Sequence, residues 1–155
     1  YLNITILPPA YLDVVSPDEE EEGRNNMVEG APRPHIMVVD DMRTNLEVMR
    51  GILDNIYNLT LCKSGYQAIQ YMKKNPFPDL IIMDVDMPEM TGIEATVKIN
   101  EITGGTVPVL FVTAICDTQT VITCRELHAA GYIVRPYKPV YIKSEIERIL
   151  SGWRH

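Results

Sequence analysis

The feature that most constrains the fold is a set of short apolar runs that do not alternate with polar residues and that end on polar ones. Residues 80–83, Leu-Ile-Ile-Met, end on Asp84, and residues 35–39 end on Asp40-Asp41. Residues 107–112 form a third run, which ends on Thr113-Ala114. A strand that is apolar on both faces is typical of a parallel sheet covered by helices. Pro88 and Gly92 then end the segment after Asp84 and precede a new helical pattern.

Helical patterns and short strands alternate along the rest of the chain. Further strands are expected at residues 57–63 and 131–134. Helices are expected at residues 46–56, where Val48 is counted on the apolar face, and near residues 68–72, 93–99, 118–130 and 140–150. Five βα units predict an α/β fold, a doubly wound parallel sheet with helices on both faces.

Composition and charge divide the chain into an acidic segment and one globular domain. The 155 residues suit a single core, and 46% hydrophobic with 23% charged residues is typical of a soluble globular protein. Residues 1–35 hold seven acids and two bases of a chain whose net charge is −7, so no basic surface for nucleic acid is indicated. We therefore expect an acidic linker at residues 1–34, the domain at residues 35–151 and a tail at residues 152–155.

The expected location is the cytoplasm. Cys62, Cys116 and Cys124 are odd in number and form no CxxC pair, which indicates reduced thiols. No apolar run approaches the ~20 residues of a membrane helix, and no signal peptide opens the chain. The first residue is Tyr rather than Met, which indicates a fragment or a processed product.

The polar residues that follow the strands are the candidate functional residues. Parallel strands bring their carboxyl ends to one edge, so Asp40, Asp41, Asp84 and Thr113 should converge there. Carboxylates that lie close together resist ionising unless a cation neutralises them. Mg²⁺ prefers oxygen ligands and leaves coordination positions for a phosphate, whereas the absence of His near these strand ends disfavours zinc. The pattern indicates phosphoryl transfer with one carboxylate as nucleophile.

These motifs resemble the receiver domain of two-component response regulators over about residues 35–151. The resemblance implies a flavodoxin-like fold with strand order 2-1-3-4-5, an order that the general rule for such sheets gives for members of this family. It implies phosphorylation on Asp84, with Mg²⁺ bound by Asp40, Asp41, Asp84 and the backbone carbonyl of Asp86. It also implies that Thr113 contacts the phosphoryl group and that Tyr132 is the aromatic residue that turns inward on activation.

One departure from the family pattern leaves two alternatives open. The family places a lysine before a proline at the end of the fifth strand, and this chain offers Arg135-Pro136 and Lys138-Pro139. Ungapped counting from Thr113 places Arg135 in that position, whereas Lys138 needs three extra residues upstream. Arginine binds phosphate through a rigid fork and lysine as a compact point charge, so the choice changes the contact.

The resemblance implies a histidine kinase or a histidine phosphotransfer protein as donor, and a homodimer through the face of the fourth and fifth strands and helices. The domain would catalyse only its own phosphorylation and dephosphorylation, so it is not predicted to be an enzyme. Residues 1–8 resemble the last strand of a histidine-kinase ATP-binding domain, which implies the receiver end of a hybrid kinase. The alternatives are a phosphatase similar to the haloacid dehalogenases, on Asp84-Val85-Asp86, and a non-phosphorylated pseudo-receiver binding module.

Overall fold

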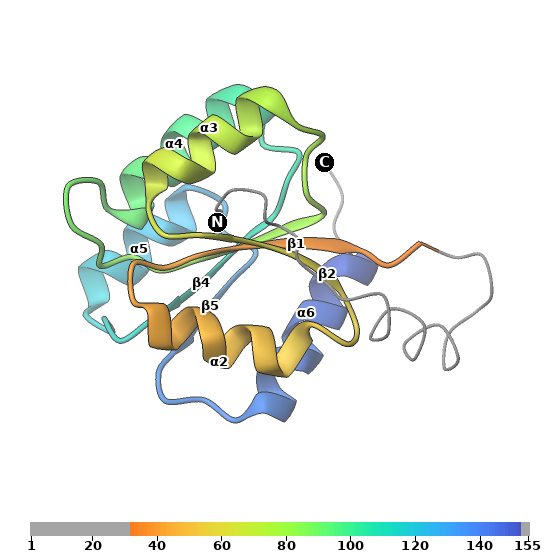
Figure 1. Ribbon diagram of the computed structural model, residues 1–155. Helices are drawn as coiled ribbons and strands as arrows, with labels where there is room; N and C mark the ends of the chain where they lie inside the picture. The colour runs from red at the N-terminus through yellow and green to blue at the C-terminus, as the bar shows by residue number, and fades with distance from the viewer. Residues whose placement is uncertain (1–31, 153–155) are drawn as a thin grey trace.

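The computed structural model describes residues 32–152, which form a five-stranded parallel sheet with helices on both faces (Figure 1). The strands run in the order β2-β1-β3-β4-β5. Their bounds are β1 (His35–Val39), β2 (Asn58–Cys62), β3 (Leu80–Met83), β4 (Val109–Thr113) and β5 (Gly131–Val134). The helices are α2 (Arg43–Leu53), α3 (Gly65–Lys74), α4 (Gly92–Thr103), α5 (Thr118–Glu126) and α6 (Pro139–Gly152). The predicted doubly wound fold and its strand order are confirmed.

Successive residues of each strand point to opposite faces, and each face is covered by its own helices. One face packs on α3, α4 and α5, and its buried strand residues are Met37, Val39, Cys62, Ile81, Met83, Val109 and Phe111. The other packs on α2 and α6, and its buried strand residues are Ile36, Val38, Leu59, Leu80, Ile82, Leu110, Val112 and Ile133. Figure 1 shows the same division of the helices between the two faces. Burial on both faces explains why the central strands carry no polar alternation.

Three details of the helices differ from the expectations. The helix expected at residues 46–56 ends at Leu53, and its Val48 is 55% exposed. Val48 lies two positions after buried Leu46, which places it about 200° around α2, away from the sheet. The helix expected at residues 118–130 ends at Glu126, because His128 takes a left-handed conformation with φ of 62° that a helix cannot continue.

Three segments predicted from the sequence lie wholly or mostly outside the described part of the chain. The kinase-like segment at residues 1–8 and most of the acidic linker precede residue 32, and residues 153–155 of the tail follow Gly152. Within the described range, Arg33 binds the domain, since its Nη2 donates to the carbonyl oxygen of Asp54 at 3.0 Å. No helix among residues 32–152 is long and apolar enough to cross a membrane.

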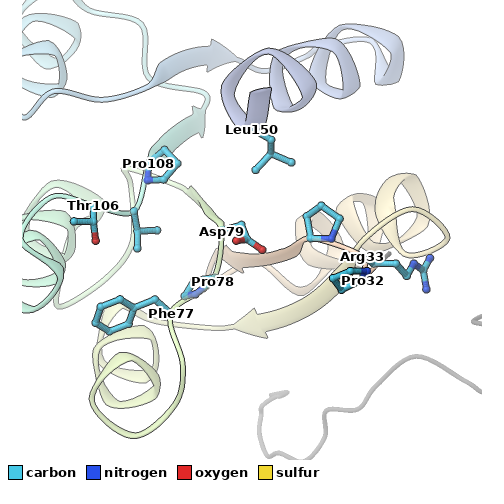
Figure 2. Close-up of a pocket in the computed structure, with 10 residues that line it drawn as sticks. Pro32, Arg33, Phe77, Pro78, Asp79, Thr106, Pro108 and Leu150 are labelled. Atoms are coloured by element: carbon cyan, nitrogen blue, oxygen red, sulfur yellow. The ribbon is translucent and has the colours of Figure 1, made fainter. Parts of the chain in front are cut away.

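A cavity of about 680 Å³ opens at the amino ends of the strands, and prolines and other apolar residues form much of its lining (Figure 2). Two charged residues also line it, and both bind the backbone. Asp79 accepts the His35 N–H at 2.8 Å, and Arg33 donates to the carbonyl oxygens of Asp54 and Ile56. The acidic residues of the predicted site lie at the other edge of the sheet, so this cavity is separate from that site.

Candidate functional site at the carboxyl edge of the sheet

The polar residues that follow the strands do converge at the carboxyl edge, because the backbone ladder of the sheet continues into them. The Asp40 N–H donates to the carbonyl oxygen of Cys62 and the Asp84 N–H to that of Val39, both at 3.0 Å. The Arg135 N–H donates to the carbonyl oxygen of Thr113 at 2.8 Å. These bonds join β1 to β2, β3 to β1 and β5 to β4 at the point where the chain leaves the sheet.

Three of these segments leave the sheet by the same local turn. In each, a side-chain oxygen at the strand end accepts the backbone N–H two residues later. The Asp40 Oδ1 accepts from Met42 at 2.9 Å, the Asp84 Oδ1 from Asp86 at 3.3 Å, and the Thr113 Oγ1 from Ile115 at 3.3 Å. The turn uses one lone pair of each side-chain oxygen for a local hydrogen bond. The remaining lone pairs are available to bind other groups in the site.

The acidic cluster consists of Asp40, Asp41 and Asp84, from each of which one carboxylate oxygen lies within 4.8 Å of the others. Asp40 is 2% exposed and Asp84 is 5% exposed, while Asp41 is half-buried. Burial raises the pKa of Asp40 to about 6, and the charge of Asp84 adds to the shift. Burial also raises the pKa of Asp41, with Asp84 and Asp86 adding to it.

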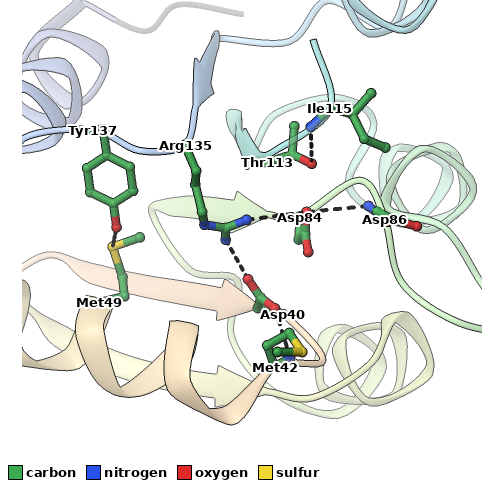
Figure 3. A network of polar contacts seen from close by, with 9 residues as sticks. All are labelled: Asp40, Met42, Met49, Asp84, Asp86, Thr113, Ile115, Arg135 and Tyr137. Atoms are coloured by element: carbon green, nitrogen blue, oxygen red, sulfur yellow. Dashed lines mark hydrogen bonds and ion pairs between the residues drawn. The ribbon is translucent and has the colours of Figure 1, made fainter. Parts of the chain in front are cut away.

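Arg135 provides the positive charge of the site (Figure 3). Its guanidinium lies between two carboxylates, with Nη2 at 2.5 Å from the Asp40 Oδ2 and Nη1 at 3.8 Å from the Asp84 Oδ1. Lys138 is exposed and directly precedes α6, and its backbone oxygen accepts from Tyr141 and Ile142. Of the two basic residues that the sequence left open, the structure brings Arg135 to the acidic cluster.

Thr113 and Tyr132 form the neighbouring side of the site. Thr113 is fully buried at the end of β4. Tyr132 lies on β5 beside Phe111, with ring centroids 6.2 Å apart, and its hydroxyl donates to the carbonyl oxygen of Ile115 at 2.7 Å. Burial is the main reason that the pKa of Tyr132 rises to about 12. The ring thus connects β5 to the loop that follows Thr113.

The loop from Asp84 to α4 depends on Gly92. The Gly92 N–H donates to the carbonyl oxygen of Val85 at 2.9 Å, which draws the start of α4 against the end of β3. A Cβ on Gly92 would overlap the backbone oxygen of Asp84. Thr91 caps α4 through a reciprocal pair of hydrogen bonds with Glu94. The sequence marked Gly92 only as a turn residue, whereas its missing side chain permits the close approach of helix and strand.

The sequence did not anticipate two contacts of Asp40. The hydrogen bond from the Met42 N–H could be predicted from the sequence, because an aspartate at the end of a strand often accepts the backbone N–H two residues later. Its ion pair with Arg135 joins residues 95 positions apart, and no local pattern marks such a pair. The Asp86 carboxylate is exposed, and its backbone carbonyl stays a predicted ligand.

The acidic cluster fits a magnesium ion. Mg²⁺ takes oxygen ligands at about 2.1 Å, so two ligands on opposite sides of the ion lie about 4.2 Å apart. Neighbouring ligands of such an ion lie about 3.0 Å apart, so the three carboxylate oxygens, which lie within 4.8 Å of one another, would move closer together around it. Asp40, Asp41 and Asp84 could therefore hold the ion with small side-chain adjustments, and a buried carboxylate next to a bound cation can act as a nucleophile.

Comparisons with known proteins agree with this geometry. Residues 36–147 match the family model of the response regulator receiver domain. The two-component response regulator ORR11 of Oryza sativa subsp. indica is 32% identical over 124 residues, which are 79% of this chain and 81% of that protein. The signal transduction histidine-protein kinase BarA of Escherichia coli K12 is 43% identical over 68 residues, 43% of this chain and 7% of that protein. A signal receiver domain of a histidine kinase from Syntrophus aciditrophicus, 31% identical, superposes with a TM-score of 0.69 over 79% of this chain and 93% of that one.

Proposed function

The chain belongs to the response regulator receiver domain family, and from this premise we propose that it is a phosphoacceptor whose Asp84 takes a phosphoryl group from a phosphohistidine donor with Mg²⁺ bound. The observation that carries the proposal is the cluster of Asp40, Asp41 and Asp84 beside Arg135 at one edge of the sheet. The donor would be a histidine kinase or a histidine phosphotransfer protein.

Asp84 is the residue of the cluster that suits the role of nucleophile. It ends β3, the middle strand of the sheet, and the turn to Asp86 occupies only its Oδ1. A carboxylate oxygen of Asp84 would form the new P–O bond as the P–N bond of phosphohistidine breaks, and the imidazole would leave with the bonding electrons. Bound Mg²⁺ would supply positive charge to the phosphoryl oxygens. Asp40, Asp41 and the carbonyl of Asp86 would complete its protein ligands.

The residues around Asp84 offer a means of transmitting phosphorylation. The Thr113 hydroxyl and the Arg135 guanidinium would donate to phosphoryl oxygens of the acyl phosphate. The Thr113 hydroxyl accepts the N–H of Ile115, and the carbonyl oxygen of Ile115 accepts from the Tyr132 hydroxyl. A movement of Thr113 would therefore be transmitted to Tyr132 through Ile115. The face formed by β4, α5, β5 and α6 would then repack, and this face is the proposed homodimer surface.

The test is the intact mass of the protein after incubation with acetyl phosphate and Mg²⁺. One added phosphoryl group is expected, and it should be absent with EDTA and in Asp84→Asn. The matched control is Asp117→Asn, an exposed aspartate at the start of α5 that is outside the acidic cluster, so this variant should still accept phosphate. Addition at another residue, or none with wild-type protein, overturns the proposal. Rapid multiple-turnover hydrolysis of a phosphomonoester would instead indicate a phosphatase.

A further inference from the structure

Asp40 already has a donor on each of its carboxylate oxygens. The Met42 N–H donates to Oδ1 at 2.9 Å, and the Arg135 Nη2 lies 2.5 Å from Oδ2. The Asp40 side chain is almost fully buried, so bulk water does not compete for these positions. Each oxygen keeps a further lone pair, but a cation bound at Oδ2 would lie close to the positively charged guanidinium, so metal binding at Asp40 and the contact with Arg135 oppose each other.

The bond to Arg135 is the one that can be exchanged. The Met42 N–H belongs to a tight backbone turn two residues from Asp40, whereas Arg135 reaches Asp40 through a long side chain that is 22% exposed. A guanidinium nitrogen so close to the Asp40 Oδ2 and a cation bound to that oxygen would compete for the same space. The second guanidinium nitrogen lies 3.8 Å from the Asp84 Oδ1, which gives the group a nearby partner after it leaves Asp40.

We infer that Arg135 and the divalent cation compete for Asp40, so that loading the cation moves the guanidinium from Asp40 toward Asp84 and the incoming phosphoryl group. The inference rests on the proposed function and concerns the regulation of the same site. The charges permit both groups to remain, because a divalent cation and one guanidinium together balance the three carboxylates. Arg135 is thus a positioning residue that makes metal binding weaker and couples it to the release of its own side chain.

Mn²⁺ binding, measured by the loss of the electron paramagnetic resonance signal of the free ion, tests the inference without phosphorylation. Arg135→Gln removes both the contact and the charge, and we expect it to bind Mn²⁺ at least about tenfold more tightly than wild type, about 1.4 kcal/mol. Arg135→Lys keeps the charge, but its single nitrogen cannot hold Asp40 and Asp84 as the fork does. It should bind more tightly than wild type and less tightly than Arg135→Gln.

The matched control is Lys138→Gln, which removes one charge three positions further along the chain, from an exposed side chain that precedes α6. Its Mn²⁺ affinity should equal that of wild type. Circular dichroism of each variant shows whether the fold is retained, and Arg135→Lys preserves the test if Arg135→Gln does not fold.

Each remaining outcome decides the matter. Equal affinity of wild type and Arg135→Gln overturns the inference, as does weaker binding by Arg135→Gln. Equal affinity of wild type and Arg135→Lys, with only Arg135→Gln tighter, shows a general charge effect and also overturns it. If no variant binds Mn²⁺, both the inference and the proposed function fail. If the affinities follow the expected order but Asp84 accepts no phosphate, the proposed function fails and the competition stands.

Discussion

Gly92 lies so close to Asp84 that a Cβ at position 92 would overlap the backbone oxygen of Asp84. The contact joins the first residue of α4 to the residue that follows β3. Backbone cannot yield as a flexible side chain can, so a substitution here must move either the helix or the strand end. The position of the proposed phosphoacceptor is therefore tied to the absence of a side chain eight residues later.

Gly92→Ala should destabilise the protein and displace Asp84. Overpacking of this kind costs about 1–3 kcal/mol, which urea unfolding would measure. The control is Gly51→Ala in α2, where an added Cβ has no heavy atom within 4 Å. Because alanine is favoured over glycine inside a helix, Gly51→Ala should raise the free energy of unfolding by about 0.5–1 kcal/mol. Equal effects of the two substitutions would contradict the proposed crowding.

Asp40 should make the stability of the metal-free protein depend on pH. Burial raises its pKa from 3.8 to about 6, so the folded state holds this proton more tightly than the unfolded state. Its contribution to stability is present below about pH 4 and is lost as the pH rises through about 6. Two pKa units correspond to about 3 kcal/mol. Asp40→Asn stays uncharged, so its free energy of unfolding relative to wild type should increase between about pH 4 and about pH 7, measured in EDTA.

Asp117 gives a control of opposite sign for that titration. Hydrogen bonds from the Thr120 N–H and hydroxyl lower the pKa of this exposed carboxyl. Its stabilising contribution is therefore present above its unfolded pKa and is lost as the pH falls. Asp117→Asn should lose stability relative to wild type as the pH rises. The same direction of change in both variants would show that the pH dependence does not come from these sites.

Substitution of Arg135 should slow phosphorylation of the protein more than substitution of Lys138. The comparison is made at saturating Mg²⁺, where competition for Asp40 no longer limits metal binding. Arg135→Ala removes a charge-assisted hydrogen bond worth about 1.5–3 kcal/mol, so the rate of phosphorylation by acetyl phosphate should fall tenfold or more. Lys138→Ala should change it little, because Lys138 is exposed and lies beyond the acidic cluster. A large effect of Lys138→Ala with a small effect of Arg135→Ala would assign the phosphate contact to Lys138.

Tyr132 should stabilise the loop after β4 through its hydroxyl. Tyr132→Phe keeps the ring beside Phe111 but removes the donor to the Ile115 carbonyl. The loss of one neutral hydrogen bond should lower the free energy of unfolding by about 0.5–1.5 kcal/mol. Tyr66→Phe, at an exposed position of α3, is the control and should leave it nearly unchanged. Hydrogen exchange of the Ile115 region should increase only in Tyr132→Phe.

The sheet and its acidic edge could be predicted because they depend on patterns that repeat along the chain. Residues 80–83 are apolar without alternation, which predicts a strand buried on both faces, and Asp84 follows directly. Once the strands are parallel, their carboxyl ends must share one edge, whatever the details of packing. This rule alone places Asp40, Asp41, Asp84 and Thr113 at the same edge.

Contacts between distant segments could not be predicted in this way. Val48 is a different case, because its position two residues after Leu46, about 200° around α2, already excludes it from the buried face by helical periodicity alone. Gly92 reads as a turn in the sequence, and only the packing of α4 against the end of β3 reveals the overlap that excludes a side chain. Such contacts depend on differences of an ångström or less, which residue spacing does not specify.

The amino-acid sequence by itself determined the order of strands and helices, the acidic edge and the family, since all of these follow from local patterns and motif spacing. Only the tertiary structure brings Arg135, rather than Lys138, to the acidic cluster. Both precede a proline near the end of β5, and a difference of three residues lies within what a loop can absorb. The 2.5 Å contact of Arg135 with Asp40, across 95 residues of chain, exists only after the five strands are in register.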